Sequence, residues 1–149
     1  MTGERWLLAG GVLSLLAAAA HLAVIAGGPD WYRFFGAGEP MARAAERGMI
    51  APALITAGIA AVLGVWAAYA FSGARLLPRL PLLRVGLVAI GAVCLLRGAV
   101  LAPGLAALAR GEARMGAYST AFVVWSSAIV LALGAAYAIG TWKAWRALG

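Results

Sequence analysis

Charged residues are scarce in this chain. Only 11% of its 149 residues are Asp, Glu, Lys or Arg, while 64% are hydrophobic and the mean hydropathy is +0.94. Soluble domains carry about 25% charged residues. The composition therefore excludes an ordinary soluble domain and predicts an integral membrane protein.

Cysteine and histidine occur once each, as Cys94 and His21. This excludes an internal disulfide and a structural metal site built from several Cys and His ligands. Because a b-type haem usually takes two axial ligands, haem at His21 would need a second copy of the chain or another ligand type such as methionine. We therefore expect no metal and no cofactor, and we interpret Cys94 as a small buried hydrophobic residue.

Catalytic patterns are also missing. The chain contains no HExxH motif and no acidic residue inside its apolar runs, and Ser126-Ser127 has no base on a matching motif. Hydroxyl groups on membrane helices commonly serve helix packing. The sequence thus favours a non-catalytic protein, and the lack of acids also argues against a cation relay.

Basic residues exceed acidic ones by 12 to 5, which gives a net charge of +7. They stand singly at the ends of the apolar runs rather than together in a patch. This distribution indicates membrane anchoring, with anionic lipids rather than nucleic acid as the partner.

Four apolar runs, each near the roughly 20 residues that a spanning helix needs, can be identified. They cover about 6–27, 49–72, 81–103 and 117–141. Pro81 is expected to open the third run, and Pro103-Gly104 to close it. The first run is longer than the apolar part of a signal peptide, so we expect it to be retained. The sequence predicts an all-α integral membrane four-helix bundle, with residues 1–149 as a single transmembrane domain.

The distribution of Lys and Arg predicts the topology. Six basic residues fall on the side of the termini and five on the opposite side. The first set is Arg5, Arg75, Arg79, Arg84, Lys143 and Arg146, and the second is Arg33, Arg43, Arg47, Arg110 and Arg114. By the positive-inside rule, both termini are expected in the cytoplasm.

The segment between the first two runs is rich in aromatic residues, with four of them within residues 31–35. Asp30 after Gly-Pro is expected to cap a short helical turn, and Pro40 to open a second one. Such a segment either anchors the chain in the headgroup zone or covers a binding cavity as a lid. The sequence leaves both interpretations open.

Arg97 is the residue that most needs explanation, because an arginine inside a membrane helix costs roughly 2.5–3.5 kcal/mol on insertion scales. His21 and Arg97 each lie six residues before the expected end of an outward-running helix, near Gly27 and Pro103. At 1.5 Å per residue, both would lie roughly 9 Å below the same surface. This matched depth predicts a polar site in the outer half of the bundle.

Two interpretations of that site follow. In the first, the Arg97 guanidinium binds an oxyanion bidentately, and His21 adds a titratable donor. In the second, Glu46 or Asp30 neutralises Arg97, and His21 bonds to a carbonyl or hydroxyl group. The candidate ligand-binding residues are Arg97, His21, Glu46, Tyr118, Thr120, Trp31, Tyr32 and Arg33.

The first functional hypothesis is accordingly the binding or passage of a small anionic or amphiphilic ligand, lipid-like or bearing a carboxylate or phosphate. The alternative is a structural or accessory subunit that packs against other membrane proteins, as a homo-oligomer or in a larger membrane complex. A wide small-residue face would favour the second hypothesis.

The stretch from Gly28 to Glu39, the following Met41 to Gly48, and Leu96-Arg97-Gly98 with Pro103 together resemble a pattern in small bacterial four-helix membrane proteins. Those proteins have no assigned activity. The resemblance implies a four-helix architecture and a bacterial inner membrane, and it transfers no catalytic residue.

Overall fold

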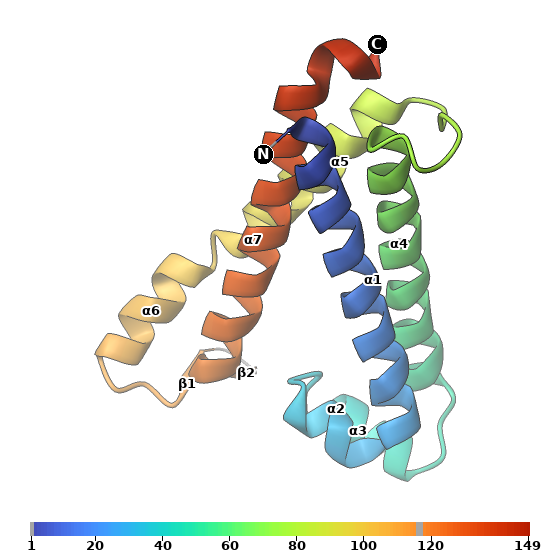
Figure 1. The fold of residues 1–149 in the computed structure, drawn as a ribbon. Coiled ribbons are helices and arrows are strands. Elements are labelled where there is room, and N and C mark those ends of the chain that lie inside the picture. Colours follow the sequence, from blue (N-terminus) through green and yellow to red (C-terminus); the bar gives the residue numbers. More distant parts are fainter. Residues whose placement is uncertain (1, 116–117) are drawn as a thin grey trace.

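The computed structural model describes residues 2–115 and 118–149. Its long helices are α1 (Gly3–Gly27), α4 (Ala51–Gly73), α5 (Leu83–Gly98) continued by α6 (Leu101–Ala109), and α7 (Thr120–Ala144) (Figure 1). Four spans, Gly3–Gly27, Ala51–Gly73, Leu83–Ala109 and Thr120–Leu148, are long and apolar enough to cross a membrane. The prediction of an all-α four-helix membrane protein is confirmed.

The segment between the first two long helices forms two short helices, α2 (Pro29–Phe34) and α3 (Glu39–Glu46). Each has a proline in its first turn, where the missing backbone N–H does no harm. Both helices follow a glycine with positive φ, Gly28 at 70° and Gly38 at 91°. The predicted helical segment therefore exists, and we call α2 and α3 together the cap.

The third span is kinked rather than ended by Pro103. α5 stops at Gly98, Ala99 and Val100 form a turn, and α6 runs on to Ala109. A proline lacks the N–H that would bond to the carbonyl four residues earlier, and its ring crowds that carbonyl. For Pro103 that carbonyl belongs to Ala99, which is where the helix breaks. The expected end at residue 103 was wrong.

The fourth long helix begins later than expected. Residues Arg114–Met115 (β1) and Tyr118–Ser119 (β2) pair as a short antiparallel ladder. α7 starts at Thr120 because the Ser119 hydroxyl caps it, accepting a hydrogen bond from the Phe122 N–H at 3.2 Å. A 3₁₀ turn, η1 (Trp145–Leu148), follows α7.

The four spans associate as two pairs. α1 packs along α4, and α5 with α6 packs along α7. Small residues permit the contact between the pairs: Gly3 lies against Ala144, and Gly140 lies against Leu7. Near the termini α1 and α7 are therefore in contact, whereas toward the other end the two pairs diverge (Figure 1). We call this second part the open half.

The main core lies on the side of the termini, where all four spans meet. Leu7, Ala70, Leu87 and Tyr137 are completely buried there, one from each span. A separate small cluster of Val24, Tyr32 and Ala42 fixes the cap to the end of α1. The open half therefore lies between a packed core and the cap.

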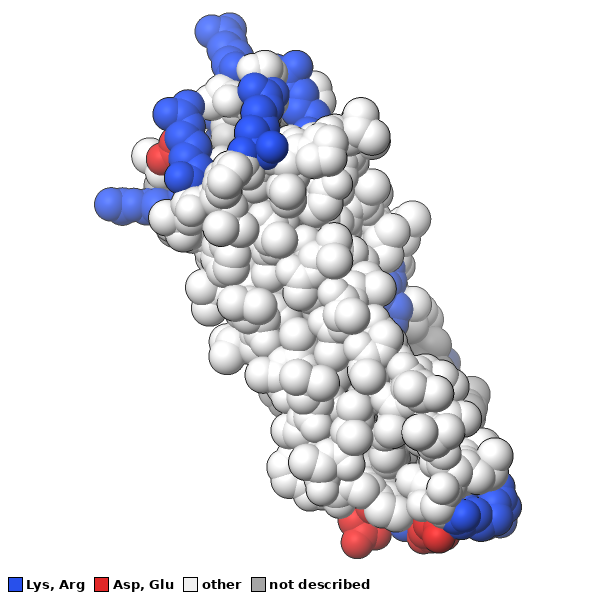
Figure 2. Space-filling view, turned by 90° about the vertical axis from the view of Figure 1, so that its right-hand side faces the viewer, with Lys and Arg blue, Asp and Glu red and all other residues white. Residues whose placement is uncertain are grey.

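Charge is concentrated at the two ends of the molecule, which are separated by a broad band that is white except for blue atoms at its right-hand edge (Figure 2). One end is mostly basic, while acidic and basic groups are mixed at the other. This is the distribution expected when the band is surrounded by lipid chains.

Candidate functional site

Arg97 lies in the last turn of α5, two residues before the kink. Its Nη1 donates to the Ser127 hydroxyl at 2.8 Å, and its Nη2 donates to the Ser126 hydroxyl at 3.2 Å. Ser126 in turn donates to the backbone carbonyl of Val123 at 3.3 Å. We call Arg97, Ser126 and Ser127 the Arg97 cluster.

The partners of Arg97 are neutral. Within residues 2–115 and 118–149, Arg97 takes part in no salt bridge. Two hydroxyl groups orient the guanidinium but do not neutralise it. Since a guanidinium has five N–H donors and two are engaged here, the remainder are available to an anion.

Arg97 lies on the inward stripe of α5. Ile90 and Cys94, four residues apart and followed by Arg97, are 6% and 1% exposed and belong to the core. Residues at these spacings share one helix face, yet Arg97 itself is exposed. This exposure accords with the divergence of the helix pairs, which moves the α1–α4 pair away from the C-terminal part of α5 (Figure 1).

The position of Arg97 along its span differs from the expected one. Because α6 extends the span to Ala109, Arg97 is twelve residues from its end (109 − 97) instead of six. Its partner Ser127 lies seven residues after Thr120, the start of α7. At 1.5 Å per residue this places the Ser127 end of the cluster roughly 10 Å from that end of α7.

His21 faces the same half of the bundle from α1. It continues the stripe of Gly10 and Ser14, which face Tyr137 of α7. Its Nδ1 lies 2.7 Å from the carbonyl oxygen of Ala17. A carbonyl can only accept, so Nδ1 carries the proton, and in the neutral ring Nε2 is then an acceptor. His21 and Arg97 thus lie on the inward stripes of opposite helix pairs, without a direct bond between them in the described residues.

Glu46 and Arg33 belong to a different polar group. Arg33 pairs with Glu46 at 2.6 Å, with Glu39 at 3.0 Å and with Asp30 at 3.2 Å, while Arg43 also pairs with Glu39 at 3.0 Å. The expected neutralisation of Arg97 by Glu46 or Asp30 is therefore not what the structure shows. Both carboxylates lie in the cap, bound to Arg33.

The ion pairs of the cap shift the titration of their members. Hydrogen bonds from Arg33 and then Arg43 lower the pKa of Glu39 to about 2. The bonds to Glu39 and Glu46 raise the pKa of Arg33 above its ordinary value. Ion pairs thus link α2 to α3 within the cap, and Glu39 stays ionised at neutral pH.

The aromatic residues of the cap divide into a buried and an exposed group. Tyr32 is 2% exposed and packs on Val24 and Ala42, and its hydroxyl is buried without a hydrogen-bond partner in the described residues. Trp31 is 43% exposed and stacks on Phe35, with ring centroids 5.6 Å apart. Tyr32 therefore anchors the cap, whereas Trp31 lies at its surface.

The cap also reaches α7. A Cβ atom on Gly36 would come within 2.5 Å of the Phe122 ring, so the cap backbone lies directly against the start of α7. Gly36 has φ of 70°, which also favours glycine. The cap thereby bridges the two helix pairs at the outer limit of the open half.

Tyr118 and Thr120 lie at that same end. Tyr118 is in β2 rather than in the helix, is 43% exposed, and contacts Phe122 with ring centroids 6.0 Å apart. Thr120 is 1% exposed, and its hydroxyl is buried without a partner in the described part of the chain. Within the described residues, no hydrogen bond joins either residue to the Arg97 cluster, so they are rim residues at most.

Ser126 is the candidate that the sequence did not identify. The sequence favours packing hydroxyls for two adjacent serines in an otherwise apolar run. Their partner Arg97 lies on another helix, 29 and 30 positions away, so no local pattern reveals the contact. The signal that could have revealed this contact is depth. Ser127 lies about two turns inside the fourth helix, close to the depth that the sequence predicts for Arg97.

Comparison with protein-family models, with curated proteins and with solved structures gives no match to this chain. Function must therefore be inferred from the side chains themselves.

Proposed function

We propose that this protein binds a small anionic or amphiphilic ligand, lipid-like or bearing a carboxylate or phosphate, at the Arg97 cluster in the open half of the bundle. The observation that carries the proposal is an arginine inside an apolar span whose side-chain partners, among the described residues, are two neutral hydroxyls, Ser126 and Ser127. A cation placed in this way is costly unless an anion joins it.

The chemistry of Arg97 suits an oxyanion. The guanidinium is planar, stays charged, and presents paired N–H donors that match a carboxylate or phosphate. Ser126 and Ser127 hold two of these N–H groups by hydrogen bonds. Such positioning reduces the entropy lost when a ligand binds.

The surroundings suit an amphiphile. Large apolar side chains are exposed along these spans, including Leu22 on α1, which is 54% exposed, and Ile129 on α7, which is 61% exposed. Such side chains would accept a hydrocarbon tail, while the Nε2 atom of His21 would accept a hydrogen bond. The site is an open face and not a closed cavity, which favours entry from the membrane or from the capped end.

We place the protein in a bacterial inner membrane with both termini in the cytoplasm. The end that carries the termini has six basic residues and one acid, Glu4, whereas the capped end has five basic residues and four acids. The excess of positive charge supports this orientation under the positive-inside rule. The ligand site would then face outward.

The test is native mass spectrometry of the gently solubilised protein. Wild type is compared with Arg97→Ala, with Arg97→Lys and with Arg47→Ala, a control that removes an exposed arginine from the cap end. We expect a defined adduct in wild type and in Arg47→Ala, loss of it in Arg97→Ala, and weakened retention in Arg97→Lys, because lysine cannot bind bidentately.

Circular dichroism and gel filtration of each variant show whether the fold persists. A folded Arg97→Ala variant that keeps every adduct carried by wild type would overturn the proposal. If wild type carries no adduct beyond random detergent and lipid, the accessory-subunit alternative becomes the leading account, and partners should be sought by crosslinking.

A further inference from the structure

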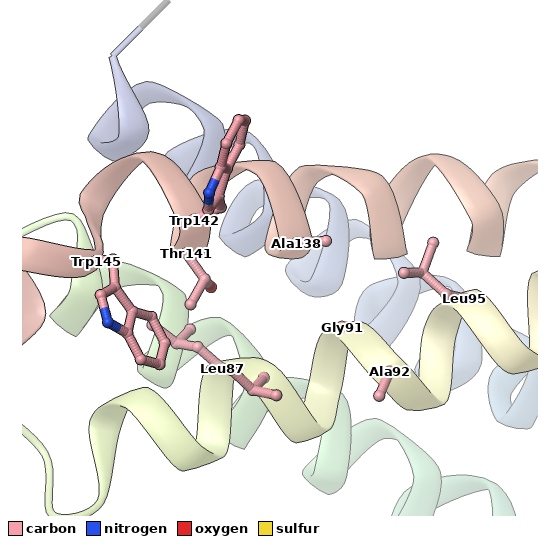
Figure 3. Close-up of a pocket in the computed structure, with 9 residues that line it drawn as sticks. Leu87, Gly91, Ala92, Leu95, Ala138, Thr141, Trp142 and Trp145 are labelled. Atoms are coloured by element: carbon pink, nitrogen blue, oxygen red, sulfur yellow. The ribbon is translucent and has the colours of Figure 1, made fainter.

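A groove lies between α5 and α7 at the end that carries the termini, away from the Arg97 cluster (Figure 3). Its volume is about 320 Å³, within the roughly 300–1,000 Å³ typical of small-molecule sites. Leu87, Gly91, Ala92 and Leu95 line it from α5, and Ala138 faces them from α7 (Figure 3). The small side chains of Gly91, Ala92 and Ala138 leave room that larger residues would fill.

One polar group interrupts this apolar lining. Thr141 is 3% exposed and lines the groove, and its side chain points from α7 toward α5 (Figure 3). Its hydroxyl is buried and has no hydrogen-bond partner within residues 2–115 and 118–149. Buried hydroxyls normally have partners, since leaving one unsatisfied costs roughly 1–3 kcal/mol. The hydroxyl oxygen is closed off in the structure, so rotation of the Thr141 side chain about χ1 would turn it toward an acceptor of an occupant.

The mouth of the groove is aromatic and basic. Trp142 and Trp145 line it. The Arg84 guanidinium lies over the Trp145 ring, 4.9 Å from the centroid, and donates to the Trp145 carbonyl at 2.8 Å. Its Nε is buried without an acceptor among the described residues. Arg84 does not itself line the groove, but it is one helical turn before Val88 on α5 and contacts Trp145, which does line it.

We propose that this groove binds one molecule of an anionic phospholipid. Its phosphate lies at Arg84, an ester carbonyl accepts a hydrogen bond from Thr141, and an acyl chain follows Gly91, Ala92 and Leu95. The order of these groups matches the order within a lipid leaflet. Tryptophans mark the membrane interface, the ester groups lie just beneath it, and hydrocarbon is deeper.

Charge complementarity favours this occupant over a second copy of the chain. The end of the molecule that holds the groove carries six basic residues against one acid, so two copies would repel each other there. An anionic headgroup would be attracted by the same charge. The site is distinct from the Arg97 cluster, and the proposal does not depend on the function proposed above.

The test uses native mass spectrometry with two added lipids of equal chain length, phosphatidylglycerol and phosphatidylcholine. Ala92→Leu fills the groove, and the matched control Ala89→Leu adds the same atoms at an exposed position of α5 that does not line it. Arg84→Gln removes the charge at the mouth of the groove. Thr141→Val removes the hydroxyl but keeps a side chain of similar shape.

We expect wild type and Ala89→Leu to hold one phosphatidylglycerol in preference to phosphatidylcholine, and Ala92→Leu to lose it. Arg84→Gln should bind both lipids equally. Thr141→Val should weaken the binding of both lipids by about two- to tenfold, the range of a single hydrogen bond. Arg97→Ala should leave this adduct unchanged, which separates it from the outer site.

Equal binding by Ala92→Leu and Ala89→Leu would overturn the proposal, as would a wild type without lipid preference. A stable dimer that dissociates on Ala92→Leu would show that a second copy occupies the groove instead. Near-ultraviolet circular dichroism of each folded variant excludes loss of binding through unfolding.

Discussion

The hydroxyl groups of Ser14 and Tyr137 lie 2.9 Å apart, and both residues are completely buried. Tyr137 also donates to the backbone carbonyl of Trp66 at 2.8 Å. Because the single phenolic proton goes to that carbonyl, the Ser14 hydroxyl must donate to Tyr137. One tyrosine of α7 thereby holds α1 and α4, and this bond lies on the core side of the point where the helix pairs diverge.

Replacing Tyr137 by Phe should lower the free energy of unfolding by about 0.5–1.5 kcal/mol, since Ser14 and the Trp66 carbonyl both lose a partner. Reversible unfolding in mixed micelles measures the change. Tyr69→Phe serves as control because Tyr69 bonds to the Pro81 carbonyl at an exposed site, at 3.2 Å. An unchanged free energy of unfolding in Tyr137→Phe would show that the bonds of the Tyr137 hydroxyl do not hold the helix pairs together.

Gly140→Ala should destabilise the bundle by about 1–3 kcal/mol, the range for overpacking a core. Its Cβ would stand 2.8 Å from Leu7 Cγ and 3.0 Å from the Leu7 backbone nitrogen, so the backbones of α1 and α7 would have to separate. Gly58→Ala on α4 meets nothing within 4 Å. The same unfolding assay should show Gly58→Ala to be neutral or stabilised by up to about 1 kcal/mol. Equal effects of the two substitutions would contradict this packing.

Pro103→Ala should straighten the third span, because alanine restores an N–H at position 103 and removes the ring that crowds the Ala99 carbonyl. That carbonyl now accepts from the Ala102 N–H at 3.3 Å, a bond of the turn, and could return to the helical i to i+4 pattern. Pulsed electron resonance between spin labels at the exposed positions Leu22 and Leu105 reports the change, in a background where Cys94 is replaced by Ala. The distance distribution should shift. Pro52→Ala, in the first turn of α4, should leave it unchanged, and a shift in both variants would rule out this origin of the kink.

The cap should resist acid. The pKa of Glu39 is lowered to about 2, well below the ordinary value of a glutamate, first by the hydrogen bond from Arg33 and then by that from Arg43. A lowered folded-state pKa means that the stabilisation is complete above about pH 4.5 and is lost as the pH falls toward 2. The protection of the α2 and α3 amides against hydrogen exchange, relative to the intrinsic rate at each pH, should therefore stay high down to about pH 4 and fall below it. In Glu39→Gln, this protection should be lower at neutral pH and should lose its pH dependence. Opening of the wild-type cap near pH 6 would refute the assignment.

Much of the architecture follows from composition and local pattern. Apolar runs of membrane-crossing length must satisfy their backbone groups internally, so they form helices wherever they are placed. Gly-Pro and Gly-Glu-Pro likewise predict the two starts of the cap helices, because proline is preorganised for a first turn. The same residue can stop a helix or kink it, so local pattern alone did not decide the outcome at Pro103. Beyond it, Gly104 of α6 lies against Val123 and Val124 of α7, a contact between residues about 20 positions apart.

The sequence by itself determined that the protein is a helical membrane bundle and that Arg97 and His21 lie on inward stripes. Only the tertiary structure decided their partners. Arg97 bonds to serines about 30 positions away, and Glu46 turns to Arg33 in the cap. The reason is physical: helical periodicity fixes which face a side chain occupies, whereas the partner on that face depends on how helices pair and where they diverge. That pairing is set by close contacts such as Gly140 with Leu7, between residues far apart in the chain.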